Sequence, residues 1–159
     1  MTAGQDGAMY ETELLDDPNQ HATTSPATTV VARFLDAIRS ATIASAADLY
    51  SRTAVLDATV PGWRFVVHGA DAVRAEYSRW FNDVSAFTEL RRLPTPNGEV
   101  IEYFLTWTED GIEHGAHHVH VLTIDASGDR IIEDHVFCGG RWPADLLAQM
   151  STPHNGSAQ

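Results

Sequence analysis

The sequence predicts an α+β fold in which a curved antiparallel sheet wraps around helices and leaves a conical cavity. Helical patterns gather in the first half of the chain, at residues 28–40, 45–52 and 70–81. Strand patterns separated by short turns follow them almost to the end of the chain. Helices placed before a run of hairpins are typical of an antiparallel sheet that carries helices on one face.

The individual elements follow from local periodicity and turn residues. Helices are expected at residues 28–40, 45–52, 70–81 and 143–150. Thr28 or Thr29 can cap the first helix, and Pro143 suits the first turn of the last one. Strands are expected at residues 53–60, 64–68, 84–93, 100–108, 112–125 and 130–138. Gly115 indicates a possible bulge in the fifth strand.

Composition limits the partners of this protein. The 159 residues suffice for one domain with a core, and the formal net charge of −12 disfavours nucleic acid and anionic membranes. No apolar run approaches the length of a membrane span. The first residues have neither a basic region nor an apolar core, so no secretory signal is expected. Cys138 is the only cysteine, which excludes an internal disulfide, and a cytoplasmic location is the default expectation.

The chain divides into one domain and two polar ends. Residues 1–27 are acidic and lack periodicity, and they are expected to be disordered. Residues 151–159 are similar and are expected to form a flexible tail. The single domain is therefore expected to span residues 28–150.

Two local patterns resemble a known family. The segment "TAVLDATVPGWRFVVHGADAVRAEY" places an acidic residue on a strand, then a turn, a strand and "HG" at the start of a helix. The segment "LTIDASGDRIIEDHV" is a hairpin followed by a polar residue in an apolar strand. Together with the element order, these segments resemble the nuclear transport factor 2-like superfamily, in its SnoaL-like polyketide cyclase and ketosteroid isomerase branch. The resemblance implies the cone fold, but this superfamily hosts both enzymes and non-catalytic proteins.

Asp57 is the first candidate for chemistry. The resemblance implies a catalytic base there, because the isomerase branch carries its base at the matching position. A carboxylate in an apolar cavity also has a raised pKa and can exchange protons near neutral pH. The alternative is an aspartate that caps a turn at the edge of the sheet.

Four histidines in seven residues, "HGAHHVH", form the second candidate. His118 and His120 are two residues apart on a strand and therefore share a face. His120 matches the family position of the second acidic group, so the resemblance implies an acid–base or oxyanion role for it, although the family has Asp there. The alternative is a polar pair on the outer face, with Val119 and Val121 in the core.

Asp134 is expected to face the cavity with Ile132, Val136 and Cys138, and to orient a histidine by accepting its N–H. A slip of one residue would instead place Glu133 and His135 inside. The cavity is further expected to be aromatic, because large apolar pockets with few polar groups are the usual small-ligand sites. The side chains expected to contact the ligand are His118, Tyr50, Trp63, Tyr77, Tyr103 and Trp107.

A metal site is the less favoured interpretation. The H-x-H pair and a carboxylate would suit zinc or ferrous iron. The spacing of a cupin motif is absent, however, and we expect neither a metal nor an organic cofactor.

The sequence thus favours a homodimeric enzyme that moves a proton next to the carbonyl group of a small hydrophobic molecule. It would do so in isomerisation, aldol-type cyclisation or dehydration. Asp57, His120 and Asp134 would be catalytic. Two alternatives are a non-catalytic binding protein for a small hydrophobic ligand and a structural dimer whose histidines face outward.

Overall fold

A computed structural model describes the backbone of residues 26–151 and the side chains from residue 29 onward. Its elements in chain order are α1 (Pro26–Arg39), the 3-10 turn η1 (Ile43–Ser45), β1 (Tyr50–Val60), β2 (Trp63–His68), α2 (Ala70–Trp80), β3 (Val84–Thr95), β4 (Gly98–Glu109), β5 (Ile112–Ile124), β6 (Ile131–Cys138), β7 (Trp142–Pro143) and α3 (Ala144–Met150). The expected disorder of residues 1–27 and the expected flexible tail fall almost entirely outside the described residues.

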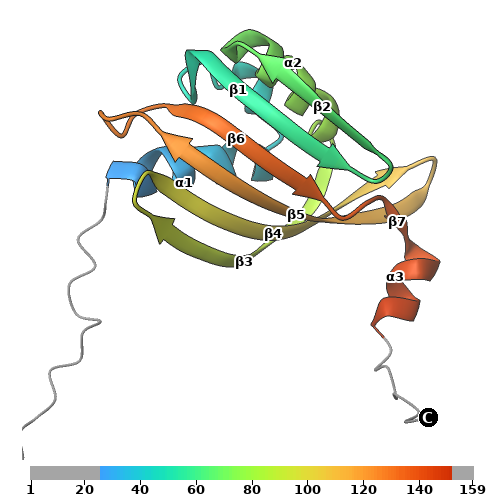
Figure 1. Cartoon of the computed structure of the whole chain (residues 1–159). Coiled ribbons are helices and arrows are strands. Elements are labelled where there is room, and N and C mark those ends of the chain that lie inside the picture. Colours follow the sequence, from blue (N-terminus) through green and yellow to red (C-terminus); the bar gives the residue numbers. More distant parts are fainter. Residues whose placement is uncertain (1–25, 152–159) are drawn as a thin grey trace, which may run out of the picture.

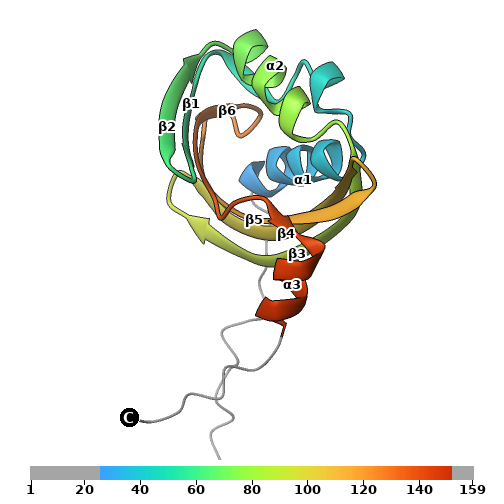
Figure 2. The ribbon, with the colours of Figure 1, turned by 90° about the vertical axis from the view of Figure 1, so that its right-hand side faces the viewer.

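The strands form one curved, open sheet in the order β2-β1-β6-β5-β4-β3, and β7 adds to β5 (Figure 1). Strands β3 to β6 are a meander of antiparallel neighbours, as predicted, whereas β1 lies parallel to β6. The sheet curls around α1, and α2 covers the upper side of its concave face (Figure 2). The predicted α+β class and cone architecture are confirmed.

Helix α1 supplies much of the core. It begins at Pro26, two residues before the predicted start, and proline fits the first turn of a helix because it lacks an N–H that would need a partner there. Its predicted apolar stripe is buried, with Val30, Phe34 and Ile38 at most 1% exposed. One continuous cluster joins this stripe to the inner face of the sheet.

The helix expected at residues 45–52 is wrong. Ser45 ends the 3-10 turn, and the chain enters β1 at Tyr50, which pairs with Ile131 of β6. The Ile131 N–H donates to the Leu49 carbonyl at 2.8 Å. The local apolar spacing fits either a helix or a strand, and pairing with a strand eighty residues away decides between them.

The bulge expected at Gly115 is also wrong. Gly115 pairs regularly with Thr106 of β4 and with Trp142 of β7. A Cβ here would lie 2.5 Å from the ring of Phe104 and 3.1 Å from Leu147 of α3. The glycine is therefore needed for space, because α3 packs on the outside of the sheet at this point (Figure 2).

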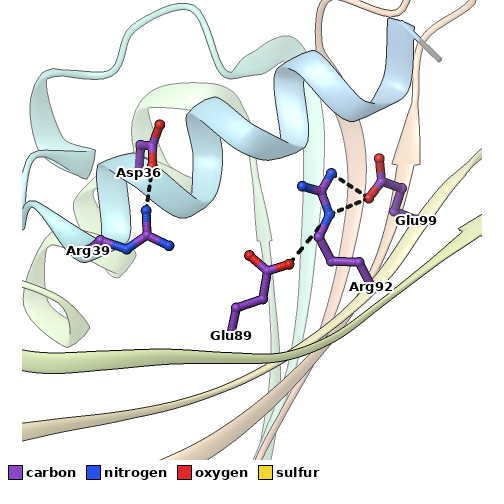
Figure 3. A network of polar contacts seen from close by, with 5 residues as sticks. All are labelled: Asp36, Arg39, Glu89, Arg92 and Glu99. Carbon is purple, nitrogen blue, oxygen red and sulfur yellow. Dashed lines mark hydrogen bonds and ion pairs between the residues drawn. The ribbon is translucent and has the colours of Figure 1, made fainter. Parts of the chain in front are cut away.

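An ion-pair network ties β3 to β4 below α1 (Figure 3). The Arg92 guanidinium donates to Glu99 at 2.7 and 2.9 Å and lies 4.0 Å from Glu89. Glu99 is almost fully buried, so its charge needs this partner. Arg39 of α1 lies over the ring of Phe87 on β3, 4.8 Å from its centroid. The ion pairs thus join β3 to β4, and the contact of Arg39 with Phe87 joins α1 to the edge of the sheet.

The helices over residues 26–151 are too short or too polar to cross a membrane.

Candidate active site

A cavity of about 780 Å³ opens at one end of the cone, where β1, β4 and β6 end. Apolar and aromatic side chains form much of its wall, and charged side chains lie at its rim. The lining residues are Val60, Pro61, Phe65, Arg79, Trp80, Asn82, Asp83, Leu105, Trp107, Thr108, Glu109, Ala116, His118, Cys138, Gly140 and Arg141. This size is within the range of small-molecule sites.

His118 on β5 is the histidine that lines the cavity. Alternation along β5 points it inward, and its side chain is 3% exposed. Its ring packs against Tyr103 at 5.2 Å, Phe81 at 5.6 Å and Trp80 at 6.2 Å between centroids. Among residues 26–151, its Nδ1 atom has no hydrogen-bond partner.

His118 is a neutral imidazole. Burial is the main cause that lowers its pKa from 6.5 to about 3, and electrostatic interaction with the neighbouring His120 and His117 adds to this shift. A neutral imidazole offers both a lone pair and an N–H, and this ring lines the cavity, with its Nδ1 atom buried and without a partner among residues 26–151. His118 can therefore accept or donate a proton, or a hydrogen bond, at the ligand.

Behind His118 lies a fully buried polar network, which we call the Asp134 cluster. It consists of Asp134, His120, Tyr50, Tyr77 and Tyr103. His120 Nδ1 lies 2.8 Å from Asp134 Oδ1, and His120 Nε2 lies 2.9 Å from the Tyr103 hydroxyl. The hydroxyls of Tyr50 and Tyr77 donate to Asp134 Oδ2 at 3.0 and 2.7 Å.

The protons of the Asp134 cluster follow from its chemistry. Burial, followed by the charge of Asp134, raises the pKa of the Tyr50, Tyr77 and Tyr103 hydroxyls well above 10, so they keep their protons. Tyr103 then donates to His120 Nε2, and His120 donates from Nδ1 to the Asp134 carboxylate. Each carboxylate oxygen thus accepts at least one hydrogen bond, which a buried carboxylate requires.

The inward registers of β5 and β6 are confirmed, but the Asp134 cluster does not line the cavity. His120 and Asp134 are 0% exposed, with Leu122 and Val136 beside them in the core. Val121 on the opposite face is partly exposed, which rules out the arrangement with outward histidines.

Tyr50, Tyr77 and Tyr103 were expected to contact the ligand, and this placement is wrong. Their hydroxyls bind within the cluster instead of facing the cavity. The Tyr103 ring packs on both His118 and His120, and this connects the cluster to the site.

The expected inward placement of Asp57 is wrong. Its strand neighbours Leu56 and Ala58 face the core, so Asp57 lies on the outer face of the sheet. There the Arg64 guanidinium donates to its carboxylate at 2.9 Å, and His135 Nδ1 lies 3.6 Å away. Hydrogen bonding from Arg64 is the main cause that lowers the pKa of Asp57, opposite to the raised pKa expected in an apolar cavity.

Two tryptophans expected to bind ligand have different places. Trp107 lines the cavity, stacked on His114. Trp63 is 69% exposed at the start of β2 and is not among the lining residues, so its expected placement is wrong. Two arginines that line the cavity, Arg79 and Arg141, were not singled out from the sequence. Arg141 lies over the Trp107 ring and pairs with Glu109.

Within the described part of the chain, no three histidine, cysteine, aspartate or glutamate side chains converge as a metal site would require.

An open sheet that curls around helices and holds a cavity at one end defines the cone fold of nuclear transport factor 2-like proteins. Solved structures with this fold are similar to the chain. One is a nuclear transport factor 2-like protein of unknown function from Burkholderia xenovorans, with a TM-score of 0.59 and 14% identity over 82% of this chain and 96% of that one.

Two further structural neighbours carry names that indicate an activity. A steroid delta-isomerase from Pseudomonas aeruginosa has a TM-score of 0.56 and 18% identity over 78% of this chain and 85% of that one. A Mesorhizobium loti protein described as a SnoaL-like polyketide cyclase has a TM-score of 0.55 and 16% identity, over 69% of this chain and 96% of that one. No family model and no curated protein sequence matches the chain.

Proposed function

We propose that the protein is a SnoaL-like small-molecule enzyme that transfers a proton next to the carbonyl group of a largely apolar substrate in the cavity. The observation that carries this proposal is His118, a neutral imidazole that lines an otherwise mostly apolar cavity and whose buried Nδ1 atom has no partner among residues 26–151. Isomerisation, aldol-type cyclisation and dehydration can each begin with removal of a proton from the carbon beside a carbonyl group. His118 takes the place that the sequence suggested for Asp57.

The step assigned to His118 is proton abstraction. The imidazole accepts the proton from the carbon, and the substrate becomes an enolate. Burial disfavours a lone imidazolium here, but the imidazolium and the enolate form together as a pair of opposite charges. Their attraction is strengthened because His118 is almost fully buried. The imidazolium then returns the proton to the carbon or to the oxygen of the product.

His120 and Asp134 are positioning residues in this proposal. Asp134 accepts a hydrogen bond from His120, and His120 accepts one from the Tyr103 hydroxyl. The Tyr103 ring, held in this way, packs against His118. A histidine fixed in one orientation loses less entropy when it meets the substrate.

Hydrogen–deuterium exchange of a simple ketone tests this proposal. Benzylacetone in D₂O should exchange its α-hydrogens faster with the protein than in buffer, as followed by NMR. His118→Gln should slow this exchange by about 100-fold or more, the usual contribution of a general base. Asp57→Asn, which changes a carboxylate on the outer face, should leave it unchanged. Exchange at the rate of buffer alone, or exchange that survives His118→Gln, would refute the assignment.

A non-catalytic binding protein is the second candidate. It is favoured by the low pKa of His118, about 3, which makes the residue a weak base before the substrate is bound. In this case benzylacetone would bind and raise the melting temperature, and its α-hydrogens would not exchange.

The homodimer also remains a proposal. It is supported by Val66, Val121 and Phe137, which are exposed on the outer face of the sheet. Light scattering coupled to gel filtration tests it, because a monomer at micromolar concentration would contradict it.

A further inference from the structure

A thiol faces the same cavity as His118. Cys138 is the last residue of β6, on the inner face that also carries Asp134 and Val136, and it lines the cavity. Its Sγ makes one long contact, 4.0 Å, with the carbonyl oxygen of Gly140. The sulfur thus stands half-buried at the cavity wall.

Cys138 lies directly opposite His118. The two residues are paired across the antiparallel strands β5 and β6, so their side chains share a face and start about 5 Å apart. His118 is 3% exposed, and its Nδ1 atom has no partner among residues 29–151. A nucleophile and a proton acceptor therefore stand side by side at the cavity.

We propose that Cys138 and His118 form a site for covalent capture of α,β-unsaturated carbonyl compounds. This inference rests on the proposed function, which identifies the cavity as the ligand site. The thiol proton passes to His118 while the sulfur bonds to the β-carbon of the ligand. The carbon–carbon double bond is consumed, and His118 delivers its proton to the α-carbon. The product is a neutral thioether with His118 neutral again, and no oxidant or reductant is needed.

The surroundings select the kind of ligand. Burial raises the pKa of the Cys138 thiol and lowers that of His118, so both groups are neutral before the reaction. Addition to a neutral ligand creates no net charge, whereas a charged reagent would have to lose its hydration in an apolar wall. Conjugated carbonyl compounds are also the products of double-bond isomerisation and of dehydration. Capture would thus hold a product of such chemistry in the site.

The test uses intact-protein mass spectrometry with benzylideneacetone, a neutral aromatic enone. Because the chain has one cysteine, an adduct of the mass of one enone reports on Cys138, and Cys138→Ala is the blank. Labelling should saturate with concentration, and saturated benzylacetone should block it. Iodoacetate, which is charged, should label the folded chain more slowly than benzylideneacetone does.

The His118 variant decides the mechanism. His118→Gln should slow labelling by about tenfold or more, as expected for loss of a proton acceptor. His117→Gln is the matched control, because His117 lies on the outer face of the same strand with Glu102. Labelling that is unsaturable, that benzylacetone does not block, or that His118→Gln leaves unchanged would overturn the inference.

Failure of capture and failure of the proposed function are distinguishable in the wild-type protein. Ketone exchange without an enone adduct removes the capture site only. An adduct without exchange leaves the capture site and removes proton transfer.

Discussion

Replacing His118 with glutamine should make the free energy of unfolding less sensitive to pH. The pKa of His118 is lowered from 6.5 to about 3 in the folded chain, mainly by burial. Below pH 6.5 the unfolded chain therefore binds a proton at this residue and the folded chain does not. The stability tied to neutral His118 is complete above pH 6.5 and is lost as the pH falls from there toward 3.

The magnitude follows from these two values. At pH 5, about 1.5 units below the unfolded pKa, protonation of His118 stabilises the unfolded chain. At about 1.36 kcal/mol per unit, this lowers the free energy of unfolding by about 2 kcal/mol. At pH 7 the same cost is about 0.2 kcal/mol. Wild type should thus lose about 2 kcal/mol more than His118→Gln between pH 7 and pH 5.

Urea unfolding at the two pH values, followed by circular dichroism, measures this difference. Taking the change within each protein removes the direct effect of the substitution on packing. His68→Gln, which replaces an exposed histidine on β2, controls for the loss of one imidazole. Equal pH dependence in wild type and His118→Gln would refute the neutral, buried state of His118. The groups facing it, namely His120, Tyr103 and Cys138, are unchanged by the substitution.

Four further outcomes are expected. Asp134→Ala should destabilise the chain by about 3–5 kcal/mol in urea unfolding, because it leaves the buried donors of its cluster without an acceptor. Glu133→Ala on the exposed face should change the free energy of unfolding by less than about 0.5 kcal/mol. If Asp134→Ala and Glu133→Ala changed it equally, the register of β6 would be contradicted. Gly98→Ala should cost about 2 kcal/mol or more by the same measurement, since its Cβ would lie 1.9 Å from a backbone carbonyl oxygen of β5; a neutral effect would show that this approach is wrong. Arg64→Gln should raise the pKa of Asp57, measured by NMR titration of the carboxyl group, and an unchanged pKa would argue against the pairing of the two.

Sequence periodicity predicted the sheet because alternation along a strand is a local property. The faces of β5 and β6 followed from it, since His118 and His120 alternate with valines and Asp134 alternates with Glu133 and His135. The same rule could have placed Asp57 correctly. Its neighbours Ala54, Leu56 and Ala58 form the apolar face of β1, and the family resemblance outweighed that signal.

The Asp134 cluster could not be derived in the same way. Its hydroxyls come from β1, α2 and β4, and their meeting depends on how the sheet curls around the helices. Local patterns state which face a side chain is on but not how deep in the cone it lies. His118 and His120 share a face, yet His118 reaches the cavity and His120 ends in the core.

NMR of the His118 imidazole during a titration with benzylacetone tests the central claim most directly. The nitrogen-15 signals, assigned by their loss in His118→Gln, should be those of a neutral ring from pH 8 down to pH 5. They should move when the ketone is added. An imidazole that becomes protonated near pH 6.5 and does not respond to the ketone would contradict a neutral histidine facing the ligand.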